Sequence, residues 1–389
     1  MDLDNDAEAI SVEAIDLGSD QTASDQAPAT LAISGMRSIS AGVWHTCLVN
    51  SAGAAQCWGK GGGGQLGNGS GEDRNTPVAV SGLSSGVIMI SAGEENTCAL
   101  LDTGGVKCWG YGSPTGYGFI GSSTPVDVSG LTSGVAAVSV GWGHACALLN
   151  TGAVKCWGSN RWGQLGNGLT GIGGETPVDV TGLSSGVTAI SAGTEYSCAV
   201  LHLGGIKCWG RSYSGQLGDG TFFDSRTPVD VSGLSSAVAV AAGGSGSGSS
   251  TCALTNSGAA KCWGDNYYGA LGNGSMANSS NVPVDVHGIS AAVSLSVGDS
   301  FACATLSTGA LQCWGYNDRG QLGNNQTVNS RIPVGVSELS SGVAAVTTGG
   351  FHACALLSSG KLKCWGENTF GELGDGTNIE RHTPVDVVF

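Results

Sequence analysis

The sequence predicts an all-β fold, a seven-bladed β-propeller with four antiparallel strands and one disulfide in each blade. Three observations predict it. A segment that reads Cys, nine residues, Cys-Trp-Gly occurs seven times, and its copies start 48 to 54 residues apart. Four short strand-like segments with turn residues between them recur in every copy. Repeats of about 40 to 50 residues with four strands each are typical of propellers.

The two cysteines of each copy are predicted to face one another across a β-hairpin. Cys47 and Cys57 lie equidistant from Ala52, and a glycine follows that midpoint in every copy, as Gly53 does here. Glycine readily adopts the positive φ that the third position of a three-residue hairpin loop requires. Opposed residues of an antiparallel pair have Cα atoms about 4.5–5.5 Å apart, within disulfide range. Zinc binding is the alternative, but nine intervening residues do not match zinc-ligand spacing. The predicted disulfide cysteines are Cys47, Cys57, Cys98, Cys108, Cys146, Cys156, Cys198, Cys208, Cys252, Cys262, Cys303, Cys313, Cys354 and Cys364.

Regularly paired cysteines are typical of proteins in an oxidising compartment. We therefore expect an extracellular, cell-surface or periplasmic location. The residues after Met1 lack the charged and apolar regions of a signal peptide, so this expectation requires a leader that has been removed. No apolar run is long enough to span a membrane, and membrane insertion is not expected.

The chain is acidic, with 30 Asp and Glu residues against 15 Lys and Arg residues. Eight of the acids lie in residues 1–29, which contain no Lys or Arg. This segment is predicted to be a disordered acidic leader, either a plain spacer or a segment that binds a partner. Residues 30–389 are predicted to form the propeller. Since the sequence shows no basic patch, nucleic acid is not an expected partner.

The third copy illustrates the four strands expected in each blade. Its small and β-branched first segment is predicted to be innermost, because strands crowd near the central axis. Its Pro-Val-Asp-Val segment is predicted to be outermost, since proline is tolerated on an edge strand. The four segments are residues 135–141, 146–149, 154–158 and 177–180. Residues 31–33 and 384–387 compete for the strand that completes the ring, and we favour the second segment.

The third copy has Gly141 and His144 before its first cysteine, in the pattern Gly-x-x-His, and Gly-Gln-Leu-Gly at residues 163–166 after Trp-Gly. These motif positions resemble the regulator of chromosome condensation repeat. The resemblance covers residues 30–389 and implies a seven-bladed propeller. The second copy departs from the pattern, because its loop after Gly110 is shorter and lacks Gln-Leu-Gly. The cysteine pair looks like a feature of exported members and is not part of the nuclear pattern. The fullest match runs through Gly141, His144, Cys146, Gly152, Trp157, Asn160, Gly163, Gln164, Leu165, Gly166 and Gly168.

Strand direction assigns the connections to two faces. The Gly-x-x-His turns and the long loops after Trp-Gly share one face, which we call the loop face. The Cys-x9-Cys hairpin tips and the Gly-Leu-Ser-Ser-Gly turns share the opposite face, which we call the hairpin face. The Cys-Trp-Gly tryptophans are expected to be structural and to fill the space between blades. They are Trp58, Trp109, Trp157, Trp209, Trp263, Trp314 and Trp365.

The remaining tryptophans and all the tyrosines map to the loop face. Protein interfaces favour exposed aromatic residues and arginine, so this face is the expected binding surface. The alternative is that its aromatic residues are ordinary packing, which Tyr196 and Phe301 exemplify because they replace His in Gly-x-x-His. The candidates for partner binding are Trp44, Glu95, Trp142, Trp162, Glu195, Tyr213, Tyr267, Tyr268, Arg319, Phe351 and Phe370.

The sequence shows no phosphate loop, no nucleophilic Ser elbow and no zincin motif. His45, His144 and His352 recur at one position and are interpreted as structural hydrogen-bonding groups in their turns. No catalytic residue, metal or cofactor is expected, and the protein is not expected to be an enzyme.

We therefore expect an exported, non-catalytic propeller that binds a protein or a glycan through the loop face. The first alternative is a guanine-nucleotide-exchange or chromatin-binding propeller, which the resemblance to nuclear members implies. The second is a structural assembly unit of a cell-surface or extracellular complex. The third is an enzyme with its site at the mouth of the central channel.

Overall fold

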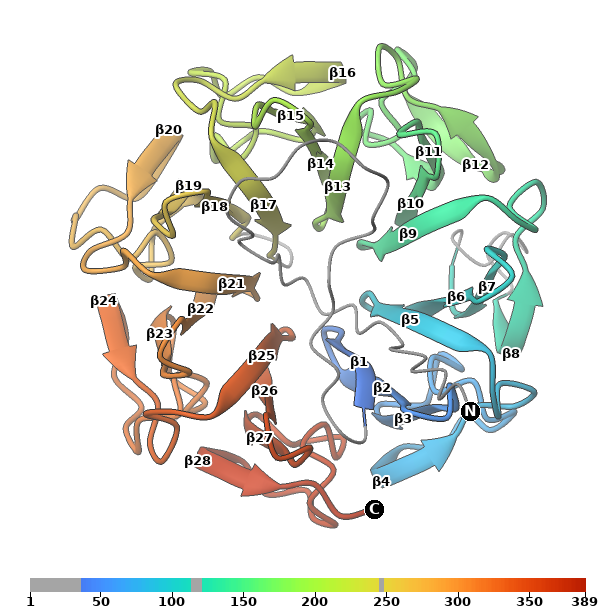
Figure 1. Ribbon diagram of the computed structural model, residues 1–389, viewed down its shortest axis with the longest axis vertical. Coiled ribbons are helices and arrows are strands. Elements are labelled where there is room, and N and C mark those ends of the chain that lie inside the picture. Colours follow the sequence, from blue (N-terminus) through green and yellow to red (C-terminus); the bar gives the residue numbers. More distant parts are fainter. Residues whose placement is uncertain (1–35, 113–120, 245–247) are drawn as a thin grey trace, which may run out of the picture.

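The computed structural model describes residues 36–112, 121–244 and 248–389. The strands in these residues form seven four-stranded antiparallel sheets arranged around a central axis (Figure 1). Each sheet contains four consecutive strands, so each blade is one repeat of the chain. The predicted seven-bladed propeller and the disulfide in each blade are confirmed. The predicted acidic leader lies outside the described residues.

Each blade has its first strand nearest the axis and its fourth strand at the rim (Figure 1). The first strands are β1 (Met36–Ala41), β5 (Val87–Ala92), β9 (Val135–Val140), β13 (Val187–Ala192), β17 (Ala237–Ala242), β21 (Ala292–Val297) and β25 (Val343–Thr348). The second strands are β2 (His45–Asn50), β6 (Asn96–Leu101), β10 (His144–Leu149), β14 (Tyr196–Leu201), β18 (Ser250–Thr255), β22 (Phe301–Leu306) and β26 (His352–Leu357).

The third strands are β3 (Ala55–Gly59), β7 (Val106–Gly110), β11 (Val154–Asn160), β15 (Ile206–Gly210), β19 (Ala260–Asp265), β23 (Leu311–Gly315) and β27 (Leu362–Gly366). The fourth strands are β4 (Arg74–Ala79), β8 (Ser122–Asp127), β12 (Gly171–Asp179), β16 (Ser225–Asp230), β20 (Ser279–Asp285), β24 (Ser330–Gly335) and β28 (Arg381–Asp386). The described residues contain no helix long and apolar enough to cross a membrane.

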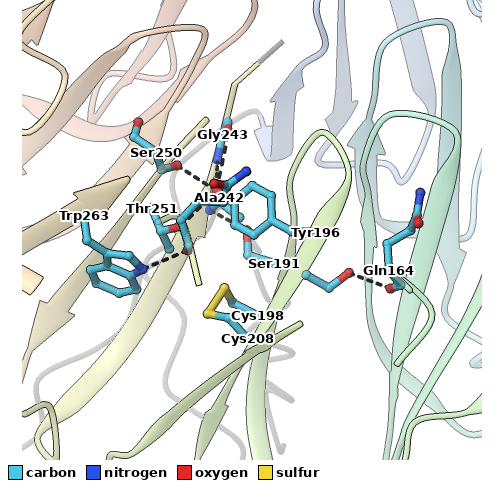
Figure 2. Close-up of a disulfide and its surroundings, with 12 residues drawn as sticks. Gln164, Ser191, Tyr196, Cys198, Cys208, Ala242, Gly243, Ser250, Thr251 and Trp263 are labelled. Carbon is cyan, nitrogen blue, oxygen red and sulfur yellow. Dashed lines mark hydrogen bonds between the residues drawn. A yellow bond between two sulfur atoms is a disulfide. The ribbon is translucent and has the colours of Figure 1, made fainter. Parts of the chain in front are cut away.

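The second and third strands form the hairpin that the cysteine spacing predicts. Cys47 pairs with Cys57, and the corresponding cysteines pair in every other blade. Their Cα atoms are 4.0 to 4.1 Å apart. Gly53 has a φ of 76°, as the three-residue loop requires. The sulfurs are buried between strands, and Figure 2 shows the pair Cys198–Cys208 beside Tyr196.

Small residues on the innermost strands connect neighbouring blades near the axis. Ser91 Oγ accepts a hydrogen bond of 3.1 Å from Val140 N in the next blade. Ser139 Oγ accepts one of 2.9 Å from Ala192 N, and Thr347 Oγ1 closes the ring by accepting one of 3.0 Å from Ala41 N. Serine and threonine at these positions bring the innermost strands close together and satisfy amide groups that face the neighbouring blade.

The first residue of the second strand makes another contact between blades. His45 Nε2 and Thr97 Oγ1 of the next blade are hydrogen-bonded at 2.8 Å. In the fourth blade Tyr196 takes this position, and its hydroxyl donates to Ser250 O at 2.8 Å (Figure 2). His144 and His352, like His45, are hydrogen-bonded to a hydroxyl group of the next blade at 2.8 Å. Burial lowers the pKa of His45 and of His352 to about 3, so both rings are neutral.

The Cys-Trp-Gly tryptophans lie deeper in the same junctions and are fully buried. The indole of Trp263 donates to the backbone carbonyl of Gln216 in the preceding blade at 2.9 Å. Five other indoles make the equivalent bond at 2.8 to 2.9 Å. Each hydrophobic cluster combines one of these tryptophans with residues of the preceding blade, so the core consists of seven layers between blades.

Blades seven and one meet through the same contacts as other neighbours. Trp58 Nε1 donates to Glu372 O at 2.8 Å, and His352 Nε2 is hydrogen-bonded to Thr46 Oγ1 at 2.8 Å. The rim strand of blade seven is β28, which confirms the preference for the C-terminal segment. The competing segment, residues 31–33, lies outside the described residues.

Two glycines of the fourth blade separate the effect of the indole contact from the effect of backbone conformation. Gly218 and Gly233 have φ values of 70° and 67°, so alanine is strained at both positions. A Cβ at Gly218 would lie 2.6 Å from Trp263 Nε1, whereas a Cβ at Gly233 would meet nothing within 4 Å. We predict that Gly218→Ala lowers the free energy of unfolding by about 1–3 kcal/mol more than Gly233→Ala does, because it overpacks the indole. Denaturant unfolding measures both variants, and equal losses would contradict this packing role.

Candidate functional site

The loop face carries a ring of positions that the backbone holds in place. The residue directly after each Trp-Gly donates its N–H to the carbonyl of the residue just before the second strand. The bond recurs in all seven blades with lengths of 2.7 to 3.0 Å. The pairs are Lys60 with Trp44, Tyr111 with Glu95, Ser159 with Gly143, Arg211 with Glu195, Asp265 with Ser249, Tyr316 with Ser300, and Glu367 with Phe351. Side chains of six different types therefore start from one repeated geometry.

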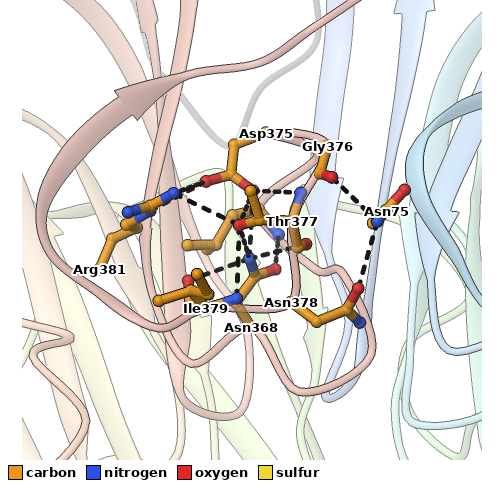
Figure 3. Close-up of polar contacts among 9 residues, drawn as sticks. Asn75, Asn368, Asp375, Gly376, Thr377, Asn378, Ile379 and Arg381 are labelled. Carbon is orange, nitrogen blue, oxygen red and sulfur yellow. Dashed lines mark hydrogen bonds and ion pairs between the residues drawn. The ribbon is translucent and has the colours of Figure 1, made fainter.

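The long loops are held by the asparagine of Trp-Gly-x-Asn. Asn368 Nδ2 donates to the carbonyls of Thr377 and Ile379 at 3.1 Å, and its Oδ1 accepts from Leu373 N at 3.0 Å (Figure 3). Asn75 of the first blade donates to Gly376 O at 3.1 Å, which ties this loop to its neighbour (Figure 3). Asn160, Asn266 and Asn317 anchor their own loops in the same way. The long loops of blades three, five, six and seven are therefore held by hydrogen bonds within the chain.

Blades three and four carry a cluster of aromatic and charged residues, which we call the arginine cluster: Arg161, Trp162, Glu195, Arg211 and Tyr213. The guanidinium of Arg211 lies 4.6 Å from the Trp162 ring and 4.4 Å from the Tyr213 ring. It also forms an ion pair with Glu195, which accepts a 2.9 Å hydrogen bond from Trp162 Nε1. A cation here is surrounded by two aromatic faces and one carboxylate.

Blades five, six, seven and one carry a continuous row of aromatic rings, which we call the aromatic arc. Ring centroids are 4.8 Å apart for Tyr267–Tyr268, 4.6 Å for Tyr268–Tyr316 and 6.0 Å for Tyr316–Phe351. The row continues through Trp44 at 5.6 Å from Phe351 and ends at Phe370, 5.8 Å from Trp44. Tyr267 is 59 % exposed and Tyr268 is 37 % exposed, so solvent reaches the arc most freely in blade five.

Acidic side chains accompany both features. Burial raises the pKa of Asp265 to about 6, and the charge of Asp299 adds to the shift. A Cβ at Gly248 would lie 3.4 Å from Asp265 Oδ2 and 3.7 Å from Asp299 Oδ1, so the two carboxylates border one small space. Burial and the neighbouring Glu95 raise the pKa of Glu94 to about 7. Glu95 itself pairs with Lys60 at 2.6 Å.

A channel runs along the axis between the innermost strands. It forms a cavity of about 180 Å³ that is lined mostly by serine, threonine, glycine and aliphatic residues. Glu94, Trp142, Thr194 and Asp299 line it at the loop face. Within the described part of the chain, no group of three or more His, Cys, Asp or Glu residues is arranged to hold a metal ion.

The structure distributes the predicted binding candidates over several places. Trp162, Glu195 and Tyr213 belong to the arginine cluster. Trp142 lies apart from both features, at the channel mouth, and is 41 % exposed. Arg319 lies 3.5 Å from Glu380. The candidates in the aromatic arc are Trp44, Tyr267, Tyr268, Phe351 and Phe370.

Among the residues that sequence reasoning missed as candidates, four share one position in the repeat: Lys60, Arg211, Asp265 and Tyr316. All four directly follow Trp-Gly, and that position varies from blade to blade. Comparison of the repeats at this position is the signal that points to them. Tyr196 and Phe301 are fully buried, so these two aromatic residues are packing, as the alternative interpretation held.

A family model of the regulator of chromosome condensation (RCC1) repeat matches more than half of the chain, at residues 53–100, 151–200, 204–249, 258–305 and 308–356. The chain belongs to this RCC1-repeat family. A second model with the same description matches the RCC1 repeats at residues 135–164, 237–270, 292–321 and 343–372. The resemblance deduced from the repeated motifs is thereby confirmed.

Two relatives are each 30 % identical to the chain over the residues that they match. The RCC1-repeat chain is 30 % identical to the ultraviolet-B receptor UVR8 of Arabidopsis thaliana over 357 residues, which is 90 % of this chain and 69 % of the receptor. It is also 30 % identical to the human E3 ubiquitin-protein ligase HERC2 over 226 residues, but this match spans 56 % of the chain and only 5 % of the ligase.

Two solved structures share the fold. Human WBSCR16 superposes with a TM-score of 0.75 at 22 % identity, covering 86 % of this chain and 94 % of that one. Prp20p of Saccharomyces cerevisiae also superposes with a TM-score of 0.75, at 20 % identity, and the match covers 86 % of this chain and 85 % of Prp20p. That structure was described together with the binding of Prp20p to Gsp1p and histones. At these identities the likeness concerns the fold alone.

Glu372 makes the junction between blades seven and one of this RCC1-repeat propeller sensitive to pH. It replaces the glutamine of Gln-Leu-Gly, and Oε2 accepts from Phe370 N at 2.9 Å. Burial raises its pKa from 4.5 to about 7. Because the folded-state pKa exceeds the unfolded value, the stability contribution is present below pH 4.5 and is lost as the pH rises to 7.

We predict that Glu372→Gln stabilises the protein at pH 8 by on the order of 2–3 kcal/mol and has little effect at about pH 4, since glutamine needs no proton to stay neutral. Thermal or denaturant unfolding at both pH values measures this difference. Glu175→Gln, at an exposed position of β12, is the matched control and is expected to change stability little at either pH. A Glu372→Gln effect that does not depend on pH would contradict the prediction.

Proposed function

We propose that this chain is an exported, non-catalytic propeller that binds a protein or a glycan through its loop face. The observation that carries the proposal is the contrast between the two faces. Loops held by backbone and asparagine bonds display the arginine cluster and the aromatic arc, while short turns of near-identical sequence make the hairpin face. A surface formed in advance loses little conformational entropy when it binds a partner.

The disulfides support export. Each blade has one, and all of the cysteines are buried. Disulfides persist in oxidising compartments and are rare in the reducing cytosol. The proposal therefore places the binding event outside the cytosol, at the cell surface, in the periplasm or in the extracellular medium.

Family members also support a binding role. Prp20, the yeast RCC1, has been solved with Kap60 bound, so a propeller protein of this family engages another protein. The ultraviolet-B receptor UVR8 uses the fold in a receptor. A role in nucleotide exchange or chromatin binding, like a role in structural assembly, is the alternative for this chain. The acidic net charge disfavours chromatin as the partner.

The test is to replace exposed hydrophobic residues on each face and measure binding to one purified partner. The partner is identified by affinity capture from the extracellular fraction of the source organism, or by a glycan array. We predict that Trp142→Ala with Tyr268→Ala weakens binding at least tenfold without lowering the melting temperature, because both side chains are solvent-exposed.

Leu203→Ala is the matched control, since Leu203 is 87 % exposed at a hairpin tip on the opposite face. It is expected to bind as the unmodified protein does. Unchanged affinity of the loop-face variant together with loss of affinity in the Leu203 variant would overturn the assignment of the face.

A further inference from the structure

We infer that the aromatic arc receives a lysine or arginine side chain of a protein partner. This inference rests on the proposed binding role of the loop face and specifies the chemistry of the partner. It is drawn from the comparison of two parts of one surface, the arginine cluster and the arc.

The arginine cluster shows how this surface holds a cation. Arg211 lies against the rings of Trp162 and Tyr213 and forms an ion pair with Glu195. The guanidinium of Arg161 lies 5.2 Å from the centroid of the Trp162 ring. The cluster therefore provides both the aromatic faces and the positive charges, and its interactions are satisfied within the chain.

The arc has the same aromatic and acidic components but lacks a cation over most of its length. Lys60 lies 5.6 Å from Phe370 at one end, and it is paired with Glu95. Among the described residues, no Lys or Arg stacks on Tyr267, Tyr268 or Tyr316. The exposed end of the arc, at Tyr267 and Tyr268, therefore presents aromatic rings to solvent without a stacked cation from the described residues.

Carboxylates border these unoccupied rings. Asp265 Oδ2 accepts a 3.2 Å hydrogen bond from Tyr267 N. Asp318 is hydrogen-bonded to the Tyr316 side chain, and burial together with this carboxylate raises the pKa of that tyrosine. The position after Trp-Gly is Asp265 in blade five and Arg211 in blade four, so neighbouring blades present opposite charges from equivalent sites.

The arginines nearest to the arc have partners of their own. Arg319 lies 3.5 Å from Glu380. The guanidinium of Arg331 donates to the carbonyls of Asn266, Ser275 and Tyr267 at 3.0 to 3.1 Å. These arginines support the loops, and neither stacks on the arc.

A basic side chain matches this surface better than a neutral sugar does. A cation over an aromatic ring contributes about 0.5–2 kcal/mol, and nearby carboxylates add charge pairing. A neutral sugar would stack on the same rings, but it would take water from the carboxylates without neutralising them, which is unfavourable. Charge complementarity therefore favours a protein segment with an exposed lysine or arginine.

The experiment selects peptides from a phage-displayed random library on the immobilised full-length protein at low ionic strength. The inference predicts that selected peptides are enriched in Lys or Arg. Replacing those residues by norleucine or citrulline in the synthetic peptide should weaken binding at least tenfold. The Asp265→Asn, Asp318→Asn double variant should show a similar loss, and increasing salt should weaken binding of the unmodified protein.

The matched control is Asp127→Asn, which removes an exposed carboxylate from the rim strand β8 and should leave peptide binding unchanged. Thermal melting checks that each variant is folded. Asparagine at Asp265 is not expected to unfold the protein, because burial already disfavours the charged form there.

The possible results separate the two claims. If Tyr268→Ala abolishes binding but the double Asp variant and the norleucine or citrulline peptides bind normally, the inference is wrong and the proposed function stands. Selection of peptides without basic residues, or binding of neutral glycans only, also overturns the inference. If neither the Tyr268 variant nor the double Asp variant changes binding, both the inference and the proposed face are wrong.

Discussion

The hydrogen bonds that six buried indoles donate to the backbone of the preceding blade are the constraint on which the ring depends. Trp263 bonds to Gln216 O, and Trp58 makes the same bond to Glu372 O where the last blade meets the first. The contact gives the buried indole N–H a hydrogen-bond partner, and the same two carbonyls also accept from Thr251 Oγ1 and Thr46 Oγ1 at 2.9 Å. It also explains the glycine of Gln-Leu-Gly, because Gly218 lies against the indole where a Cβ would collide. One tryptophan in each repeat thus determines how the next blade is placed.

The loop face results from this constraint. Since every blade repeats the same frame, the residue after Trp-Gly leaves each blade at an equivalent point, and only its side chain differs. In blades three and four the side chains form a cluster in which Arg211 pairs with Glu195 and stacks on Trp162. In blades five, six, seven and one the side chains form a row of aromatic rings with carboxylates beside it. The functional proposals rest on this asymmetry between two parts of an otherwise repetitive surface.

Most of the fold could be predicted because its determinants are local. The symmetry of Cys47 and Cys57 about Ala52, with Gly53 directly after the midpoint, predicts the hairpin register, and strand direction predicts the two faces. Contacts between blades were harder to predict, since no single repeat contains both partners. His45 binds Thr97 of the next blade for this reason. The association of Trp162 with Glu195 and Arg211 likewise depends on how two blades are placed side by side.

Hydrogen–deuterium exchange with and without a bound partner tests the central claim most directly, because it reports on both faces at once. The structure predicts that binding slows exchange in loop-face segments such as residues 265–278 and 316–329. Exchange at hairpin tips such as residues 51–54 should stay the same. Slower exchange at the hairpin tips with unchanged loop-face segments would contradict the account.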